Sequence, residues 1–108
     1  MTVKQFVDEE LCVPVTRVGN KFIAEAIELV LDRRDHKFYE ELSEITHKKQ
    51  SYLETAIRTA KVIGLSNMRI NLRTELFGNY LTQGIPTNME YILKATEYYR
   101  RKYENKES

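Results

Sequence analysis

The sequence has few of the residues that cross-link or interrupt a small protein. Its 108 positions hold one cysteine, two prolines, four glycines and no tryptophan. A single thiol, Cys12, cannot form an internal disulfide, and two histidines beside it do not complete a zinc-binding set. The low glycine and proline content excludes a collagen-like or low-complexity chain. We expect one globular domain over residues 1–108 that needs no metal and no cofactor.

Long hydrophobic runs are also missing. Unbroken apolar stretches reach three or four residues, far short of the ~20 that a membrane-spanning helix requires. The N-terminus lacks the basic and then apolar pattern of a secretory signal. These absences predict a cytoplasmic protein with no membrane segment. No catalytic pattern stands out either, and Cys12 lies in an apolar stretch typical of an inert thiol, so we do not expect an enzyme.

The net charge of +1 conceals a gradient along the chain. Residues 1–46 carry six basic and ten acidic side chains, whereas residues 47–108 carry eleven basic and six acidic ones. The small total excludes a uniformly basic nucleic-acid coat and an acidic tail protein. The second half is the better candidate for contact with an anionic partner. A charge asymmetry also suits a solvated surface, so a structural motif is needed beside it.

Apolar residues recur at three- and four-residue intervals along most of the chain, the spacing of one helix face. Six helices are expected, over about 3–11, 21–31, 38–46, 52–63, 70–77 and 88–103. The second of these is the expected centre of the core. Residues 104–108 are expected to be frayed, and no convincing strand appears. The sequence therefore predicts an all-α domain.

The fourth expected helix has clear local signals. Ser51, followed three residues later by Glu54, forms a capping box that starts the helix at Tyr52. Gly64 is the expected left-handed stop. The predicted buried stripe consists of Leu53, Ala56, Ile57, Ala60 and Ile63. The residues expected to face outward are Tyr52, Thr55, Arg58, Thr59 and Lys61.

The last helix is marked in the same way. Thr87 and Glu90 form a second capping box, which starts this helix at about Asn88. Gly78 closes the helix before it, and residues 79–86 have the composition of a loop. The predicted buried stripe consists of Tyr91, Ile92, Ala95, Tyr98 and Tyr99. Tyrosines at this spacing are more typical of a core than of a base-stacking surface.

Helices 38–46 and 52–63, joined by a polar turn, have the form of a helix-turn-helix, whose second helix enters the DNA major groove N-terminus first. In that arrangement Arg58 donates to guanine O6 and N7, Glu54 accepts from cytosine N4, and Thr55 meets a base edge or a thymine methyl. The side chains expected at DNA phosphates are Lys48, Lys49, Gln50, Ser51 and Lys61. The expected partner is double-stranded DNA.

The same residues have plainer explanations. Helical hairpins are common in all-α domains, so the pattern alone does not establish DNA binding. Glu54 is explained as the capping partner of Ser51, and Arg58 as a solvated helix residue. Both alternatives stay open at the level of the sequence.

Four segments, spread from about Leu11 to Tyr103, add a more specific signal by their order and spacing. They are Val13-Pro14 followed by Glu25-Ala26-Ile27, Leu53-Glu54-Thr55-Ala56-Ile57-Arg58-Thr59-Ala60, Leu76-Phe77-Gly78, and Pro86-Thr87-Asn88. In these segments the chain resembles the C-terminal DNA-binding effector domains of the stage zero sporulation response regulators, the master transcription factors of endospore formation in bacteria.

The resemblance implies about six helices around a helix-turn-helix that binds a short DNA element and regulates transcription. The family reads bases with a Glu-Arg pair and a further Arg one turn on. Glu54 and Arg58 match the first and last of these, whereas Thr55 stands where the family has the middle Arg. Losing one bidentate arginine changes or relaxes readout at about one base pair, worth ~1–3 kcal/mol.

The resemblance also implies contact with the sigma subunit of RNA polymerase, through a patch that follows the recognition helix. Phe77 matches that patch, and Met68 and Leu81 occupy neighbouring positions of it with altered residues. The family's receiver domain has no counterpart here, so the chain is expected to be either a standalone regulator or an excised domain. Useful affinity for DNA usually requires two copies on adjacent half-sites, as a homodimer.

A second hypothesis belongs to a different class. The domain would keep the fold but bind DNA weakly, acting as a protein-interaction module or as an antagonist of a full-length regulator. Thr55 and the near-neutral charge favour this alternative.

Overall fold

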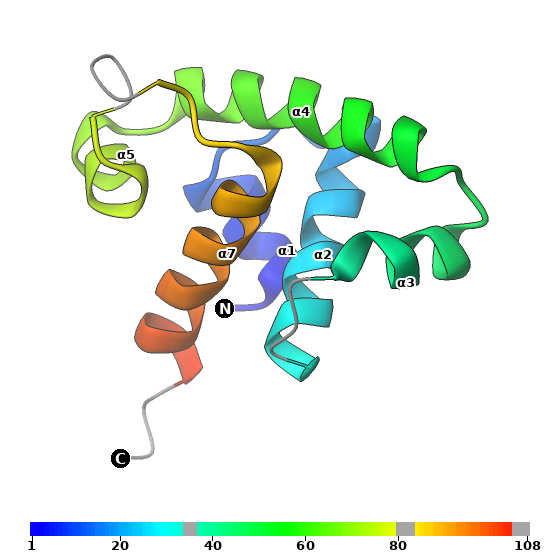
Figure 1. Cartoon of the computed structure of the whole chain (residues 1–108). Coiled ribbons are helices and arrows are strands. Elements are labelled where there is room, and N and C mark those ends of the chain that lie inside the picture. Colours follow the sequence, from blue (N-terminus) through cyan, green and yellow to red (C-terminus); the bar gives the residue numbers. More distant parts are fainter. Residues whose placement is uncertain (34–36, 80–83, 105–108) are drawn as a thin grey trace.

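Helices make up all of the regular structure in residues 1–33, 37–79 and 84–104, the part of the chain that this computed structural model describes. Six α-helices and two π-helical segments lie in that part, and no strand. In chain order they are α1 (Val3–Gln5), η1 (Phe6–Glu10), α2 (Val18–Arg33), α3 (Phe38–Thr46), α4 (Gln50–Asn67), α5 (Ile70–Phe77), α7 (Asn88–Tyr99) and η2 (Arg100–Glu104) (Figure 1). The prediction of an all-α fold with about six helices is confirmed.

α2 is the centre of the domain. It packs against α1, α3, α4 and α7, and α4 lies across the end of the molecule at the top of Figure 1. α5 turns back from the end of α4 and packs on α7. The central role of α2 agrees with its apolar pattern, although the helix begins at Val18, three residues before the expected Lys21.

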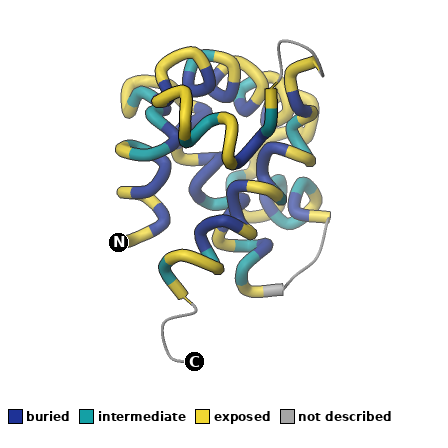
Figure 2. The backbone as a smooth tube through the Cα atoms, turned by 90° about the vertical axis from the view of Figure 1, so that its left-hand side faces the viewer, coloured by how far each residue is buried: buried dark blue, intermediate teal, exposed yellow. Residues whose placement is uncertain are grey.

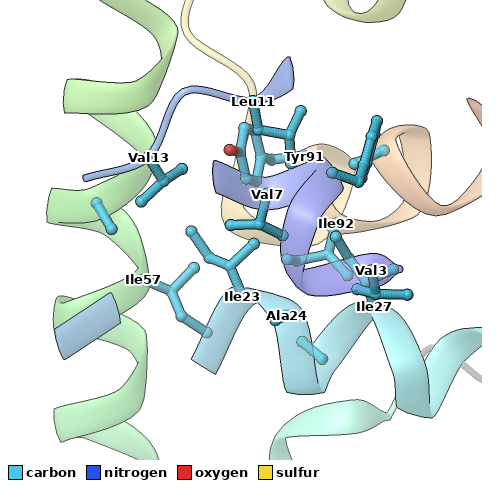
Figure 3. Close-up of a cluster of buried hydrophobic side chains, with 14 of the residues drawn as sticks. Val3, Val7, Leu11, Val13, Ile23, Ala24, Ile27, Ile57, Tyr91 and Ile92 are labelled. Carbon is cyan, nitrogen blue, oxygen red and sulfur yellow. The ribbon is translucent and has the colours of Figure 1, made fainter. Parts of the chain in front are cut away.

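Side chains from four elements meet in the core beside α2 (Figure 3). Val7 of η1, Ile23 of α2, Ile57 of α4 and Ile92 of α7 are all fully buried. Burying an aliphatic side chain of this size contributes about 1.5–3 kcal/mol to stability. The buried stretches of the backbone face the middle of the molecule and the exposed stretches lie outside (Figure 2).

α4 is longer at both ends than the sequence predicts. The helix begins at Gln50, and its N-cap residue, Lys49, makes no side-chain capping hydrogen bond. The capping box predicted for Ser51 is therefore wrong. Gly64 does not end the helix either, because it lies inside it, three residues before Asn67. A Cβ at this position would come within 2.8 Å of Val13 Cγ2. The glycine therefore allows the helix to pack closely against the loop that holds Val13, and it does not form a turn.

Other predicted ends are confirmed. α5 ends at Gly78, which has a positive φ of 72°. Thr87 Oγ1 accepts the Glu90 N–H at 3.1 Å, and Glu90 Oε1 accepts the Thr87 N–H at 2.9 Å, the two bonds of a capping box. The last helix continues beyond Tyr99 as η2 to Glu104. Most of the frayed tail predicted for residues 104–108 lies outside the described residues.

The predicted stripe of α7 is confirmed, since all five of its members are buried. Two apolar residues of the shorter helices are exposed. Ile45 is 55% exposed and Ile70 is 67% exposed, although both fit a helical apolar pattern. Each lies near an end of a short helix. No helix in the described ranges is long and apolar enough to cross a membrane.

The hydroxyl of Tyr91 is a polar group without a partner in this core. The side chain is fully buried, its ring stacks on Phe77 at 5.0 Å, and its Oη has no hydrogen-bond partner among the described residues. A buried, unpaired hydroxyl costs about 1–3 kcal/mol. Burial also raises the pKa of Tyr91.

We therefore expect Tyr91→Phe to raise the free energy of unfolding by about 1 kcal/mol at pH 7. Above about pH 10 Tyr91 ionises in the unfolded chain but stays neutral in the folded protein, so the free energy of unfolding of the wild type falls as the pH rises. The variant has no hydroxyl at this position, so its free energy of unfolding should fall less over the same pH range. Urea titrations at both pH values measure this. Tyr99→Phe is the control, because Tyr99 Oη donates to Met1 O at 2.6 Å and its removal should destabilise at pH 7. Equal decreases in the free energy of unfolding at pH 7 for Tyr91→Phe and Tyr99→Phe would contradict the prediction.

Candidate nucleic-acid interface

α3 and α4 are joined by a turn of three residues, His47–Lys49, at the right of Figure 1. His47 takes a left-handed conformation, with φ 59° and ψ 32°, and its N–H donates to Ser43 O at 2.9 Å. Ser43 Oγ donates to Lys48 O at 2.6 Å, which ties the turn back to α3. A non-glycine residue in this region is uncommon. These bonds give the two helices a short, well-defined connection.

One face of α4 is buried against the rest of the domain. Leu53, Ile57 and Ala60 lie on that face. The backbone of α2 approaches it closely at Gly19, where a Cβ would lie 2.2 Å from Ala56 O. The exposed residues of α4 up to its fourth turn are Gln50, Ser51, Tyr52, Glu54, Thr55, Arg58, Thr59 and Val62. The helix therefore presents one continuous outer face that begins directly after the turn.

The three residues predicted to read bases all lie on this outer face. Arg58 Nη2 donates to Thr55 Oγ1 at 3.3 Å, so the structure brings these two side chains together one turn apart. Glu54 is exposed beside them, and its carboxylate does not cap the helix, because Ser51 lies inside α4. The capping explanation of Glu54 is therefore wrong. Its backbone oxygen accepts from Asn88 Nδ2 at 2.9 Å.

Lys61 does not face outward, which corrects the expectation for this residue. Its side chain is only 4% exposed, and its Nζ donates to Pro86 O at 2.7 Å. Burial lowers the pKa of Lys61, and the nearby charge of Arg58 lowers it further. The segment before α7 covers this part of α4, so the ammonium group is held by a backbone carbonyl and is not presented to a phosphate.

The remaining residues predicted at phosphates lie in the turn and in the first turn of α4. Lys48, Lys49, Gln50 and Ser51 are all exposed. Lys48 Nζ lies 5.6 Å from the ring centre of Tyr52, a ring that also meets Phe22 edge-on. Free backbone N–H groups and the helix dipole favour an anion at a helix N-terminus. Two lysines at the same end strengthen that preference.

Asn88 is a residue of this region that sequence reasoning missed. Its Nδ2 donates to Tyr39 Oη and to Glu54 O, both at 2.9 Å, so it connects α7 to α3 and to α4. Burial raises the pKa of Tyr39. Beside these contacts lies a hollow of about 380 Å³, which Arg58 and Lys61 also line. The sequence marks Asn88 as a member of the Pro86-Thr87-Asn88 segment, but it gives no sign of these contacts, which depend on three helices meeting.

Two of the three residues expected to contact polymerase are buried. Met68 is 4% exposed and Phe77 is 3% exposed, and both belong to the core. Leu81 lies outside the described residues. Met68 and Phe77 therefore do not offer an exposed contact surface: both are core side chains, and the Phe77 ring stacks on Tyr91 of α7.

Comparisons with known proteins do not extend this picture. No protein-family model matches the chain, and no curated protein is similar to it in sequence. The resemblance to the sporulation effector domains therefore stays a prediction from the short segments of sequence.

Proposed function

We propose that this domain binds double-stranded DNA through α4, recognises a preferred base sequence and regulates transcription, as its resemblance to the sporulation effector domains implies. The observation that carries the proposal is the exposed pair of Arg58 and Thr55 in the first half of α4. This pair follows a three-residue turn that holds two exposed lysines, Lys48 and Lys49. Such a turn length is typical of helix-turn-helix motifs.

In the proposed complex α4 enters the major groove with its N-terminus leading, since the groove is about 12 Å wide and admits one helix. The Arg58 guanidinium exchanges its contact with Thr55 for two hydrogen bonds to guanine O6 and N7. Thr55 then faces the neighbouring base pair with a hydroxyl and a methyl group. Glu54, which is not needed as a cap, accepts from cytosine N4.

Contacts with the DNA backbone come from Lys48 and Lys49 and from the free amides at the start of α4. These contacts set position and orientation without specifying sequence. The net charge of the chain is only +1, so its general attraction to DNA is weak and the base contacts decide the target.

The test is selection of bound DNA from a random duplex pool, with wild type and with Arg58→Ala. We expect the wild type to enrich a defined element, whose repeat spacing also reports whether two copies bind. Arg58→Ala should lose preference at about one base pair and bind the selected element about tenfold or more weakly, because a bidentate pair supplies ~1–3 kcal/mol of discrimination. Arg69→Ala, which removes an exposed arginine outside α4, is the matched control.

Two results would overturn the proposal. An unchanged sequence preference in Arg58→Ala would remove α4 as the reading element. No retention of any DNA by the wild type at low salt would favour the alternative, a protein-interaction module with the same fold.

The backbone contacts have a separate signature in the salt dependence of binding. Replacing Lys48 and Lys49 together with alanine should weaken all sequences alike and reduce the slope of log K against log salt by about 2. Fluorescence anisotropy over a salt series measures the slope. The control is Lys21→Ala with Lys94→Ala, which removes the same charge from exposed sites elsewhere and should leave the slope almost unchanged.

A further inference from the structure

A second surface lies away from α4. A hollow of about 680 Å³, larger than the two that border α4, opens beside the second half of α2. It is lined by Thr2, Val3, Glu25, Glu28, Leu29, Leu31, Asp32, Ile45, Tyr99 and Glu104. We refer to these ten residues as the α2 groove. In Figure 1 the second half of α2 and the end of α7 lie at the opposite end of the molecule from α4.

Five of the ten residues of the α2 groove are apolar or aromatic. Leu29 and Leu31 are half-buried, and Ile45 at the end of α3 is 55% exposed. An isoleucine exposed singly needs no explanation, but one beside two accessible leucines in a concave surface is typical of a binding site. The apolar periodicity of α3 places Ile45 on the core side of the helix, so its exposure leaves a side chain that a partner can cover.

The charged side chains on the described rim of the α2 groove are all acidic. Glu25, Glu28 and Asp32 fall on one stripe of α2, at positions i, i+3 and i+7, and Glu104 of η2 is the fourth carboxylate. Among the described residues that line the groove there is no lysine, arginine or histidine. None of these four carboxylates forms an ion pair with a described residue. Burial raises the pKa of Tyr99, and the negative charges of Glu104 and Glu28 raise it further.

The carboxylates are not arranged for a metal ion, since the described residues contain no group of three His, Cys, Asp or Glu side chains that could hold one. A nucleic acid is excluded by repulsion between its phosphates and four carboxylates. An apolar floor with an acidic rim is complementary to a helix with one apolar stripe bordered by lysine and arginine.

We infer that the α2 groove docks a basic amphipathic helix of a partner protein. Apolar side chains at positions i and i+4 of that helix cover Ile45 and the two leucines, and its basic residues pair with Glu25, Glu28 and Asp32. The α2 part of the groove lies at the other end of the domain from α4, whereas Ile45 at the end of α3 lies two residues before the His47–Lys49 turn. The inference does not depend on the proposed DNA function.

The probe is a fluorescein-labelled synthetic peptide with leucines on one helical face and lysines beside them, compared with a peptide of the same composition in scrambled order. Two measurements are made with the full chain: anisotropy for affinity, and chemical-shift mapping of the ¹⁵N-labelled protein for location. We expect the ordered peptide to bind more tightly than the scrambled one. The largest shifts should fall in the second half of α2, at Ile45 and near Tyr99.

Charge reversal gives the decisive comparison. Glu28→Lys with Asp32→Lys should weaken peptide binding about tenfold or more, whereas Glu9→Lys with Glu97→Lys, which changes the net charge equally at exposed sites outside the groove, should change it less than about twofold. Ile45→Ser should weaken binding even at high salt, where charge pairing is screened. Should the lysine pair fail to fold by circular dichroism, Glu28→Gln with Asp32→Asn gives the same comparison without new charge.

Three outcomes would overturn the inference. The first is equal loss of peptide binding in the groove variant and in its matched control. The second is a set of shifts centred on another surface. The third is a wild-type dimer in analytical ultracentrifugation that becomes monomeric on reversal of Glu28 and Asp32, since a second copy would then occupy the groove. Binding of the peptide should be the same in Arg58→Ala, which separates this test from that of DNA recognition.

Discussion

Gly19→Ala should lower the free energy of unfolding by about 3 kcal/mol, at the upper end of the range for overpacking. The added Cβ would lie 2.2 Å from Ala56 O and 2.6 Å from Ala60 Cβ, distances that real contacts do not reach. The first is a backbone atom inside a helix, so it cannot rotate away. Alanine is a better helix former than glycine by about 1 kcal/mol, but that gain is smaller than the cost of separating α2 from α4.

Urea unfolding of Gly19→Ala beside Lys21→Ala measures this effect, because Lys21 is exposed on the same helix and its replacement should change stability by less than about 0.5 kcal/mol. Gly64→Ala should have a smaller effect than Gly19→Ala, since its added Cβ would lie 2.8 Å from Val13 Cγ2 and 2.9 Å from Leu11 O, less severe overlaps than the 2.2 Å to Ala56 O. A Gly19→Ala protein as stable as wild type would show that the close crossing of α2 and α4 does not exist. The outer face of α4 would then be positioned differently.

Phe6→Ala should cost about 3–5 kcal/mol, the usual cost of removing a fully buried aromatic ring. Phe6 is 0% exposed, and its ring centre lies 6.0 Å from that of Tyr98, 5.3 Å from that of Tyr99 and 6.2 Å from that of Tyr103. This cluster joins η1 to the end of α7 and to η2. Removal of the Phe6 ring leaves a cavity between the N-terminal and C-terminal segments. The three tyrosine rings around it are too large to move in and close that cavity.

The matched variant is Phe6→Leu, which keeps most of the apolar volume and should cost less than half as much as Phe6→Ala. Thermal and urea unfolding, followed by circular dichroism, give both values. If both substitutions cost the same small amount, the N-terminal segment would not be packed on the end of α7. The arrangement of the α2 groove, which Val3 and Tyr99 line together, would also be in doubt.

Local signals predicted the helices well where the residues concerned interact with close neighbours in the chain. The Thr87 capping box and the end of α5 at Gly78 are examples, because a cap involves residues three apart and a positive φ depends on one residue. The buried stripe of α7 is another, since helical periodicity places its members on one face. These features follow from backbone geometry alone.

The same kind of signal failed at Ser51 and Gly64. Both fit a local rule, but α4 begins one residue before Ser51 and continues three residues beyond Gly64. A side chain at Gly64 would overlap with Val13 and Leu11, which are more than fifty positions away in the chain. A glycine required by a close approach cannot be distinguished in a sequence from a glycine that ends a helix.

The candidate interface shows the same division. The sequence by itself determined that this is an all-α domain, and it placed Glu54, Thr55 and Arg58 on one helix. Only the tertiary structure decided that Glu54 is free of a capping role, that Lys61 is held by Pro86 O, and that Asn88 connects the three helices of this region. Because cysteine, proline and glycine are scarce, the fold was predicted mainly from the periodicity of apolar residues, which is a local property of the sequence. Exposure and pairing depend on residues distant in the chain, so they became known only once the helices were packed.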